Sequence, residues 1–334
     1  MKSANLSTVS PAHSALATSH SPLATTHKPL CTNHYALTTK MTDIAVIILT
    51  KDEKLHIKRC LERLAPLEPR QIFVVDCFST DETGSIVESV ASDLQLQLET
   101  PTINFVEHEW PGLYAKQFNW ALDNLPIEAS WVLRLDADEY FAPGTIERLK
   151  TALADCALND VDGLTFELKR RFMGGEIRHG TNGIRLLRLW RYGRGRLEDR
   201  AMDEHVQVHG RVVDFDGAFY DDNLNSFEWW KEKHRGYARR EAQDAISLFN
   251  NAERLKNPSA TDQKKIKYYK LPPYFRAFAY FCVRYFLKLG FLDGAAGWRW
   301  HFWQGLWYRW LVDREISKLK ACNSIPIPIL GKQV

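Results

Sequence analysis

The sequence predicts an α/β fold: a doubly wound, mostly parallel sheet with helices on both faces, followed by a helical C-terminal extension rich in aromatic and basic residues. Three observations support this fold class. Apolar segments of strand length alternate with segments of helical periodicity over residues 44–156. The apolar segments are continuous, which is typical of strands buried on both faces. A repeated strand–helix order favours parallel neighbours joined by right-handed crossovers.

The predicted elements follow one another in regular order. Residues 44–50 (IAVIILT) form the first strand, and residues 52–64 carry apolar side chains at helical spacing. The next pairs of strand and helix are expected at 71–76 with 82–94, at 103–107 with a helix through Phe118 and Leu122, and at 131–135 with 143–156. Shorter strand-like segments separated by glycines follow over about 161–220.

The C-terminal part has a different character. A long polar helix is expected over 226–255, and residues 272–312 are aromatic and basic. Four residues recur every fourth position and would form one basic stripe on a helix: Arg276, Tyr280, Arg284 and Lys288. Apolar residues lie beside them, and charged residues interrupt every window long enough to span a bilayer. Two interpretations stay open: helices lying on an anionic membrane surface, or a subdomain whose aromatic residues pack on the sheet.

The chain divides into four predicted segments. Residues 1–40 form a low-complexity tail in which a seven-residue unit repeats, without the continuous apolar stretch of a secretory signal. We expect this tail to be disordered, and Met41 is an alternative start. A sheet domain is expected at 41–225, a helical region at 226–320 and a short tail at 321–334.

Charge and cysteine content exclude several classes of protein. The 334 residues contain 44 Lys and Arg against 41 Asp and Glu, and the three lysines of residues 1–40 account for the whole excess. Because nucleic-acid-binding proteins usually carry a basic surplus, we expect no nucleic-acid partner. The six cysteines form no C-x-x-C pair, which argues against a structural zinc site or a disulfide framework. Free thiols are consistent with a reducing cytoplasm.

Carboxylates and a hydroxyl follow three of the predicted strands. Thr50, Asp76 and Asp136 end these strands, at the edge where parallel sheets bind ligands. Asp136 and Asp138 flank Ala137, and their hard oxygen atoms suit Mg²⁺ or Mn²⁺, which neutralise a diphosphate. An acid that ends an apolar strand, such as Asp76, must be solvated or bonded at the cleft, where it can accept the imide N–H of uracil. Solvated loop acids or a helix cap are the alternatives for the D-A-D segment.

Several ordered motifs resemble one enzyme family. TKDE at 50–53, VVDCFSTDET at 74–83, KQFNWAL at 116–122 and LRLDADE at 133–139 resemble the bacterial glycosyltransferase family 2, which has the GT-A fold. The later segments MDEHVQVHG, KHRGYARREA and RYFLKLGFLDGAAG resemble the subgroup that includes lipopolysaccharide core glucosyltransferases and related surface-polysaccharide enzymes. The sequence departs from the family's usual T-x-N-E at Asp52.

The resemblance implies a role for individual residues. Asp76 would read the base, Asp136 would bind the ribose side, and Asp138 with Asp136 would hold the metal ion. Glu204 would be the general base that deprotonates the acceptor hydroxyl, with Asp203 as the second choice. Further nucleotide-sugar contacts are expected from Thr50, Asp52, Glu53, Lys116 and Arg188. For Arg188 and the arginines around it, solvated charge is the alternative to contact with a diphosphate or an anionic acceptor.

The implied function is an inverting glycosyltransferase that moves a hexose from a UDP-sugar, UDP-glucose among the candidates, to a lipopolysaccharide core or another lipid-linked surface glycan. Such an enzyme would be cytoplasmic and peripheral on the inner face of the plasma membrane. The Q-x-x-R-W motif of processive synthases is absent, since four residues separate Gln304 from Arg309. The alternatives are a non-catalytic membrane-associated scaffold of the same fold and a nucleotidyltransferase, which usually has a glycine-rich loop after its first strand.

Overall fold

The computed structural model describes residues 41–97, 102–155, 157–181, 183–198 and 205–323. Within these residues a nine-stranded sheet has the order β3-β2-β1-β4-β8-β6-β11-β5, with β7 paired to β6. The strands are β1 (Thr42–Thr50), β2 (Pro69–Asp76), β3 (Thr102–Glu107), β4 (Trp131–Asp136), β5 (Glu139–Phe141), β6 (Gly163–Phe172), β7 (Gly175–Ile177), β8 (Ile184–Arg191) and β11 (Val212–Asp221). A separate ribbon pairs β9 (Gly195–Leu197) with β10 (Val206–Val208).

The first four strands pair as the sequence predicts. β1 lies between β2 and β4, β2 pairs with β3, and all three pairings are parallel. The register places Thr50 beside Asp76, and Leu49 beside Asp136. Beyond β4 the sheet is mixed, because β8 runs antiparallel to both β4 and β6. The predicted fold class is confirmed, and its strand-end polar residues lie at one edge.

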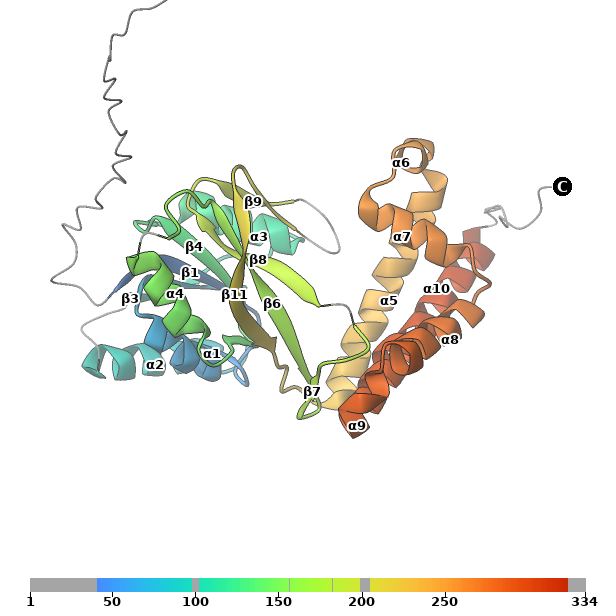
Figure 1. Ribbon diagram of the computed structural model, residues 1–334, viewed down its shortest axis with the longest axis horizontal. Coiled ribbons are helices and arrows are strands. Elements are labelled where there is room, and N and C mark those ends of the chain that lie inside the picture. Colours follow the sequence, from blue (N-terminus) through green and yellow to red (C-terminus); the bar gives the residue numbers. More distant parts are fainter. Residues whose placement is uncertain (1–40, 98–101, 156, 182, 199–204, 324–334) are drawn as a thin grey trace, which may run out of the picture. The chain divides into compact units, whose positions relative to one another are not determined.

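Two hydrophobic cores cover the two faces of the sheet, and helices lie around it (Figure 1). The helices around the sheet are α1 (Ile57–Leu64), α2 (Thr83–Gln97), α3 (Tyr114–Asn124) and α4 (Thr145–Ala154). Ile44, Val46 and Ile48 of β1 belong to the core under α1, α2 and α4. Ala45 and Ile47 belong to the opposite core, under α3. Successive side chains of a strand point to opposite faces, which explains why β1 has no polar alternation.

The helix expected over 52–64 begins later, at Ile57. The preceding residues form a loop because Asp52 has a left-handed backbone, with φ of 55°. The loop is tied to the one after β2: the Asp52 amide donates to Ser79 Oγ at 2.7 Å, and the Thr80 amide donates to the Asp52 carboxylate at 2.7 Å. These bonds hold the end of β1 open as a loop at the sheet edge.

The C-terminal part is helical, as predicted. Its elements are α5 (Phe227–Asn250), α6 (Ala252–Lys256), α7 (Ala260–Tyr269), α8 (Phe275–Cys282), a π-helical turn (Val283–Leu287), a 3₁₀ turn (Gly290–Asp293), α9 (Gly294–Trp300), a second π-helical turn (His301–Trp307) and α10 (Tyr308–Asn323). α5 packs against α10, where Ala238 and Ala242 meet Leu311 and Val312. None of the helices in the described ranges is both long and apolar enough to cross a membrane.

Two of the four residues of the predicted basic stripe point into the protein, away from any lipid. Arg276 and Arg284 are buried, with exposed fractions of 4% and 6%. Arg276 pairs with the buried Asp313, and Arg284 Nε donates to the carbonyl of Gly180 at 3.3 Å. The apolar side of α8 faces solvent instead, and Phe278 is 54% exposed. The expectation that these two arginines reach an acidic surface is wrong, because the fold supplies internal partners for them.

Candidate active site

A cavity of about 910 Å³ opens at the edge of the sheet where β1, β4 and β11 end. Its walls come from three parts of the chain. The sheet edge contributes Thr50, Lys51, Glu53, Asp136, Asp138, Glu139, Asp221 and Asn223. The loop before α3 contributes Trp110, Gly112 and Leu113, and the helical region contributes Trp230, Lys233, His234, Tyr237, Arg240, Trp300 and Gln304. The predicted ligand edge is therefore a cavity with an acidic side and an aromatic, basic side.

Asp136 lies at the end of β4 among cations and a phenol. Tyr114 donates its hydroxyl to Asp136 Oδ1 at 2.5 Å, and Arg188 Nη2 lies 3.6 Å from Oδ2. Burial by itself would raise the pKa of Asp136, but Arg134, Arg188 and the Tyr114 hydrogen bond outweigh it and lower the pKa. Asp136 is therefore a fixed negative charge at neutral pH.

Asp138 has the opposite surroundings. Its Oδ2 accepts a hydrogen bond from the Asn223 amide at 2.9 Å. Burial raises the pKa of Asp138 to about 6, and the negative charges of Asp221, Asp136 and Glu53 add to that rise. A divalent cation at this carboxylate would relieve the repulsion between these acids, and their oxygen donors are of the kind that Mg²⁺ and Mn²⁺ prefer.

The residues present fit a metal ion only in part. Among the described residues, no group of three or more His, Cys, Asp or Glu side chains is arranged to hold a metal. Asp138 and Asp136 would thus supply part of a coordination shell that substrate oxygens and water complete. Mg²⁺ in enzymes is commonly held in this manner, by one or two carboxylates together with substrate phosphates.

Arg188 supports the acidic side from behind. It is buried, and its Nη2 donates to Glu139 Oε1. Glu139 Oε2 accepts from the Asp136 amide at 3.0 Å, so the pair fixes the backbone between the two aspartates. Burial raises the pKa of Glu139, and the contact with Arg188 opposes that rise. Arg188 is not among the residues that line the cavity, and its guanidinium reaches the cavity through Asp136.

Asp76 joins the ends of two strands. It is buried, and it accepts hydrogen bonds from Thr50 Oγ1 at 2.7 Å and from the Ser79 amide and hydroxyl at 2.6 Å each. Thr50 lines the cavity, whereas Asp76 is not among the lining residues. The two residues are thus brought together as predicted, with Thr50 the nearer to the open space.

The other predicted residues lie in varied positions. Glu53 lines the cavity, and its Oε2 lies 2.6 Å from His56 Nδ1. Asp52 lies in the exposed loop, where hydrogen bonding by the Thr80 amide lowers its pKa. Lys116 is on the exposed side of α3, outside the cavity lining. Glu204 and Asp203, the predicted general base and its second choice, lie outside the described residues.

The opposite wall of the cavity is aromatic and cationic. The His234 ring stacks on Trp230, with ring centroids 3.6 Å apart, and its Nδ1 donates to the Trp230 carbonyl at 2.9 Å. Burial lowers the pKa of His234 to about 4, so this ring is neutral at physiological pH. Lys233 faces the acids closely enough to help lower the pKa of Asp136. Aromatic faces beside a cation can receive a sugar ring and an anionic group.

Sequence reasoning missed Asp221 and Asn223. Asp221 ends β11 and accepts from Arg170 Nε at 3.0 Å, while Asn223 binds Asp138. The signal was present in the segment AFYDDN, where acids follow an apolar strand as they do after β4. It was overlooked because β11 belongs to the mixed half of the sheet, whose strand direction the sequence does not reveal.

One family model matches part of the sheet region. Residues 45–208 match the model of Glycosyl transferase family 2. The mostly parallel sheet with helices on both faces agrees with the GT-A fold. No curated protein sequence matches the chain.

Solved structures show distant likeness. TarS 1–349 of S. aureus is 16% identical, with 83% of this chain and 92% of that chain covered and a TM-score of 0.38. The mannosyltransferase PcManGT from Pyrobaculum calidifontis, in complex with GDP-Man and Mn²⁺, is 16% identical, with 86% and 89% covered and a TM-score of 0.46. Glucosyl-3-phosphoglycerate synthase from Mycobacterium tuberculosis is 13% identical, with 38% and 44% covered and a TM-score of 0.28.

Proposed function

We propose that this chain is an inverting hexosyltransferase, a proposal supported by the match of residues 45–208 to the model of Glycosyl transferase family 2. Its donor is a UDP-sugar, with UDP-glucose the first to test, and its acceptor is a lipopolysaccharide core or another lipid-linked surface glycan. One observation carries the proposal: Asp138, crowded by Asp136, Asp221 and Glu53, opens into a cavity of about 910 Å³ beside the Thr50 end of β1.

The acidic side of the cavity would bind the donor. Asp76 and Thr50, with Asp52 and Glu53 in the adjoining loop, would contact the uridine, and Asp136 the ribose. Asp138 and Asp136 would hold Mg²⁺ or Mn²⁺. When bound, that ion neutralises the diphosphate and makes it a better leaving group. Arg188, which does not line the cavity, helps to keep Asp136 ionised. Lys116, which also lies outside the lining, would approach the nucleotide only at the cavity's outer edge.

The reaction needs a base on the acceptor side. The acceptor hydroxyl attacks the anomeric carbon from the face opposite the diphosphate, so the C–O bond to the diphosphate breaks as the new one forms and the configuration inverts. The hydroxyl proton passes to a carboxylate, which we assign to Glu204 with Asp203 as the second choice. The UDP product leaves with the electron pair of the broken bond.

The aromatic and basic wall would receive the acceptor. Trp110 and Trp229 line the cavity with exposed rings that offer a surface to a sugar, while Lys233 and Arg240 offer cations to phosphate or carboxylate groups. A lipid-linked acceptor places the enzyme at a membrane, so we assign it to the cytoplasmic side, peripheral on the inner face of the plasma membrane.

Calorimetric titration of the chain with UDP, GDP and CMP, each with Mn²⁺ and with chelator, tests the proposal. We expect UDP alone to bind, and only with metal. In the presence of metal, Asp138→Asn should lower the affinity for UDP about 10- to 100-fold. It should also lower kcat about 100- to 1000-fold. The control is Asp216→Asn, whose side chain is 96% exposed on the surface.

The outcomes separate the alternatives. Full activity of Asp138→Asn would show that the metal assignment is wrong. A folded chain that binds none of the three nucleotides would favour a non-catalytic scaffold.

A further inference from the structure

Exposed apolar side chains are concentrated in one segment of the chain. Of the 22 large hydrophobic side chains exposed in the described residues, 12 lie between residues 271 and 310. Five of them fall within seven positions, at Phe286, Leu287, Leu289, Phe291 and Leu292. Leu287 is 77% exposed. A contiguous set of this kind usually marks an interaction surface, whereas single exposed apolar residues need no explanation.

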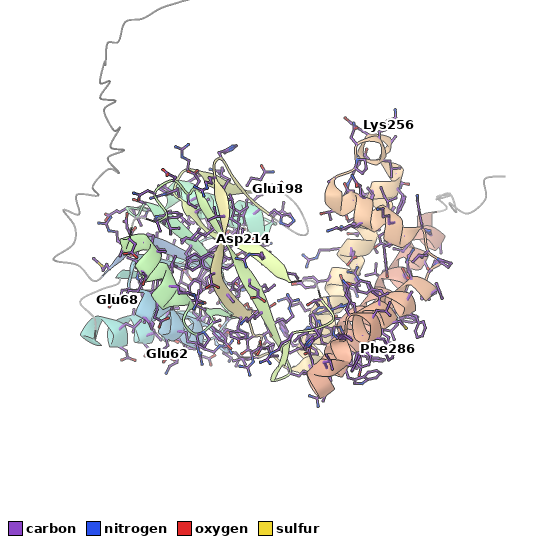
Figure 2. All side chains as sticks on the ribbon, viewed as in Figure 1. Glu62, Glu68, Glu198, Asp214, Lys256 and Phe286 are labelled. Atoms are coloured by element: carbon purple, nitrogen blue, oxygen red, sulfur yellow. The ribbon has the colours of Figure 1, made fainter. Side chains whose placement is uncertain are left out.

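These side chains belong to the turn between α8 and α9, which we call the hairpin tip (residues 283–292). Figure 2 labels Phe286 on this part of the chain. The tip is held in place from inside. The Gly180 amide donates to the Lys288 carbonyl at 2.8 Å, and the His301 ring packs so closely on Gly290 that an added Cβ would lie 2.4 Å from it. The apolar side chains are therefore exposed by a fixed backbone rather than by fraying.

Hydrogen bonds also join the end of the tip to the loop before β8. Asp293, directly after the tip, accepts from the His179 amide at 2.8 Å, and its Oδ1 lies 2.6 Å from His179 Nδ1. These contacts hold the hairpin tip against the loop before β8.

The charge around the tip favours an anionic partner. Residues 263–320 contain 12 Lys and Arg against three Asp and Glu, but several of these cations pair inside the protein: Arg276 with Asp313, Lys265 with Asp244 and Arg309 with Glu241. Two exposed cations lie at or next to the tip: Lys288 within it, and Arg299 on the following helix α9. Trp298 is also exposed, and its ring contacts Tyr285 of the tip with centroids 5.5 Å apart. Trp and Tyr are enriched at the headgroup level of bilayers, and Lys and Arg are attracted to acidic lipids.

We infer that the hairpin tip inserts into the headgroup boundary of an anionic lipid bilayer and anchors the protein there. The anchor is apolar at its centre and cationic at its margin, which is the pattern of interfacial membrane segments. This inference names the part of the chain that would make the membrane contact of the proposed function. It rests on that proposed function only for the reason why the protein would bind a membrane. Vesicle binding requires no transfer activity, so failure of the anchor and failure of the transferase proposal are distinguishable.

Co-sedimentation of the full chain with vesicles tests the inference. The vesicles are pure phosphatidylcholine, or phosphatidylcholine with 25–30% phosphatidylglycerol, at low and high salt. We expect tighter binding to the anionic vesicles, with a substantial part retained at high salt because apolar burial is not screened. Leu287→Ser should weaken partitioning about tenfold or more, since it removes most of one large apolar side chain from the membrane.

The matched control is Leu255→Ser, the same change at an exposed leucine of α6, which should partition as the wild type does. Because Leu287 projects into solvent, its substitution should not alter thermal unfolding, and Phe286→Ser provides a second variant of the tip.

Three results would overturn the inference. The first is absence of binding to either vesicle. The second is binding that high salt abolishes and that neither tip variant weakens, which would indicate adsorption by charge alone. The third is concentration-dependent self-association of the chain that Leu287→Ser removes while vesicles have no effect, which would assign the tip to a second copy.

Discussion

The sheet edge and the C-terminal hairpin differ in where their charged side chains lie. At the sheet edge, carboxylates gather around open space, and the pKa of Asp138 is raised to about 6. In the hairpin, Arg276 and Arg284 turn inward and the apolar side chains face solvent. Arg276 is paired with Asp313, and Arg284 donates to the Gly180 carbonyl, whereas burial and the like charges of Asp221, Asp136 and Glu53 raise the pKa of Asp138. Charged groups whose partners lie inside the protein thus mark structure, and like charges held together around open space mark the candidate site.

The largest expected effect comes from removing an internal partner in the hairpin region. Asp313→Ala should destabilise the protein by about 3–5 kcal/mol, because it leaves the buried Arg276 guanidinium uncompensated. Urea unfolding monitored by circular dichroism would measure the change. The double variant Arg276→Met/Asp313→Leu should recover most of the stability, since it removes both charges.

The matched control for this prediction is an exposed pair. Arg196 and Asp123 form an ion pair at 2.7 Å on the surface, and Asp123→Ala should cost at most about 1 kcal/mol. Equal effects at the two sites would show that burial does not distinguish them, and the contrast between structural and functional charges would fail.

An intermediate effect is expected from the neutral histidine in the cavity wall. Burial lowers the pKa of His234 to about 4, below the usual 6.5. Between these values the unfolded chain takes up a proton that the folded protein does not. The stability that depends on this difference is therefore complete above about pH 6.5 and falls as the pH drops toward 4. The expected loss from pH 7 to pH 5 is about 2 kcal/mol.

Thermal unfolding at a series of pH values checks this expectation. In His234→Gln, the free energy of unfolding should change by about 2 kcal/mol less between pH 7 and pH 5 than in the wild type. The same substitution at the exposed His209 should leave the pH dependence of the free energy of unfolding unchanged. An unaltered slope in His234→Gln would mean that the ring is accessible to protons in the folded state.

The smallest effect is expected where the chain passes from the sheet into α5. Ser226 caps this helix, and its hydroxyl oxygen accepts from the Trp229 amide at 3.2 Å. Ser226→Ala should lower stability by about 1 kcal/mol. Because α5 carries Lys233 and His234 into the cavity, differential scanning fluorimetry with and without UDP and Mn²⁺ would show whether this helix end also matters for binding. The corresponding change at the cap of α7, Ser259→Ala, should affect stability alone.

The sequence predicted the parallel half of the sheet and the strand-end position of Thr50, Asp76 and Asp136 because continuous apolar runs and their ends are local features. It could not predict which side of α8 faces inward. Helical spacing groups Arg276 with Arg284, but the inward side is decided by Asp313, which lies far along the chain and meets Arg276 only in the folded protein. Asp221 was missed for a similar reason, since its approach to Asp138 depends on the direction of β11.

The loops after β1 and β2 are already bonded to each other without any ligand. Asp76 takes hydrogen bonds from Thr50 and Ser79, and Asp52 takes one from Thr80. The entropy of ordering these loops is consequently lost once, when the chain folds, rather than each time a nucleotide arrives. Under the proposed function, such a site would bind its nucleotide without a loop having to close first, and would release it without a loop having to open.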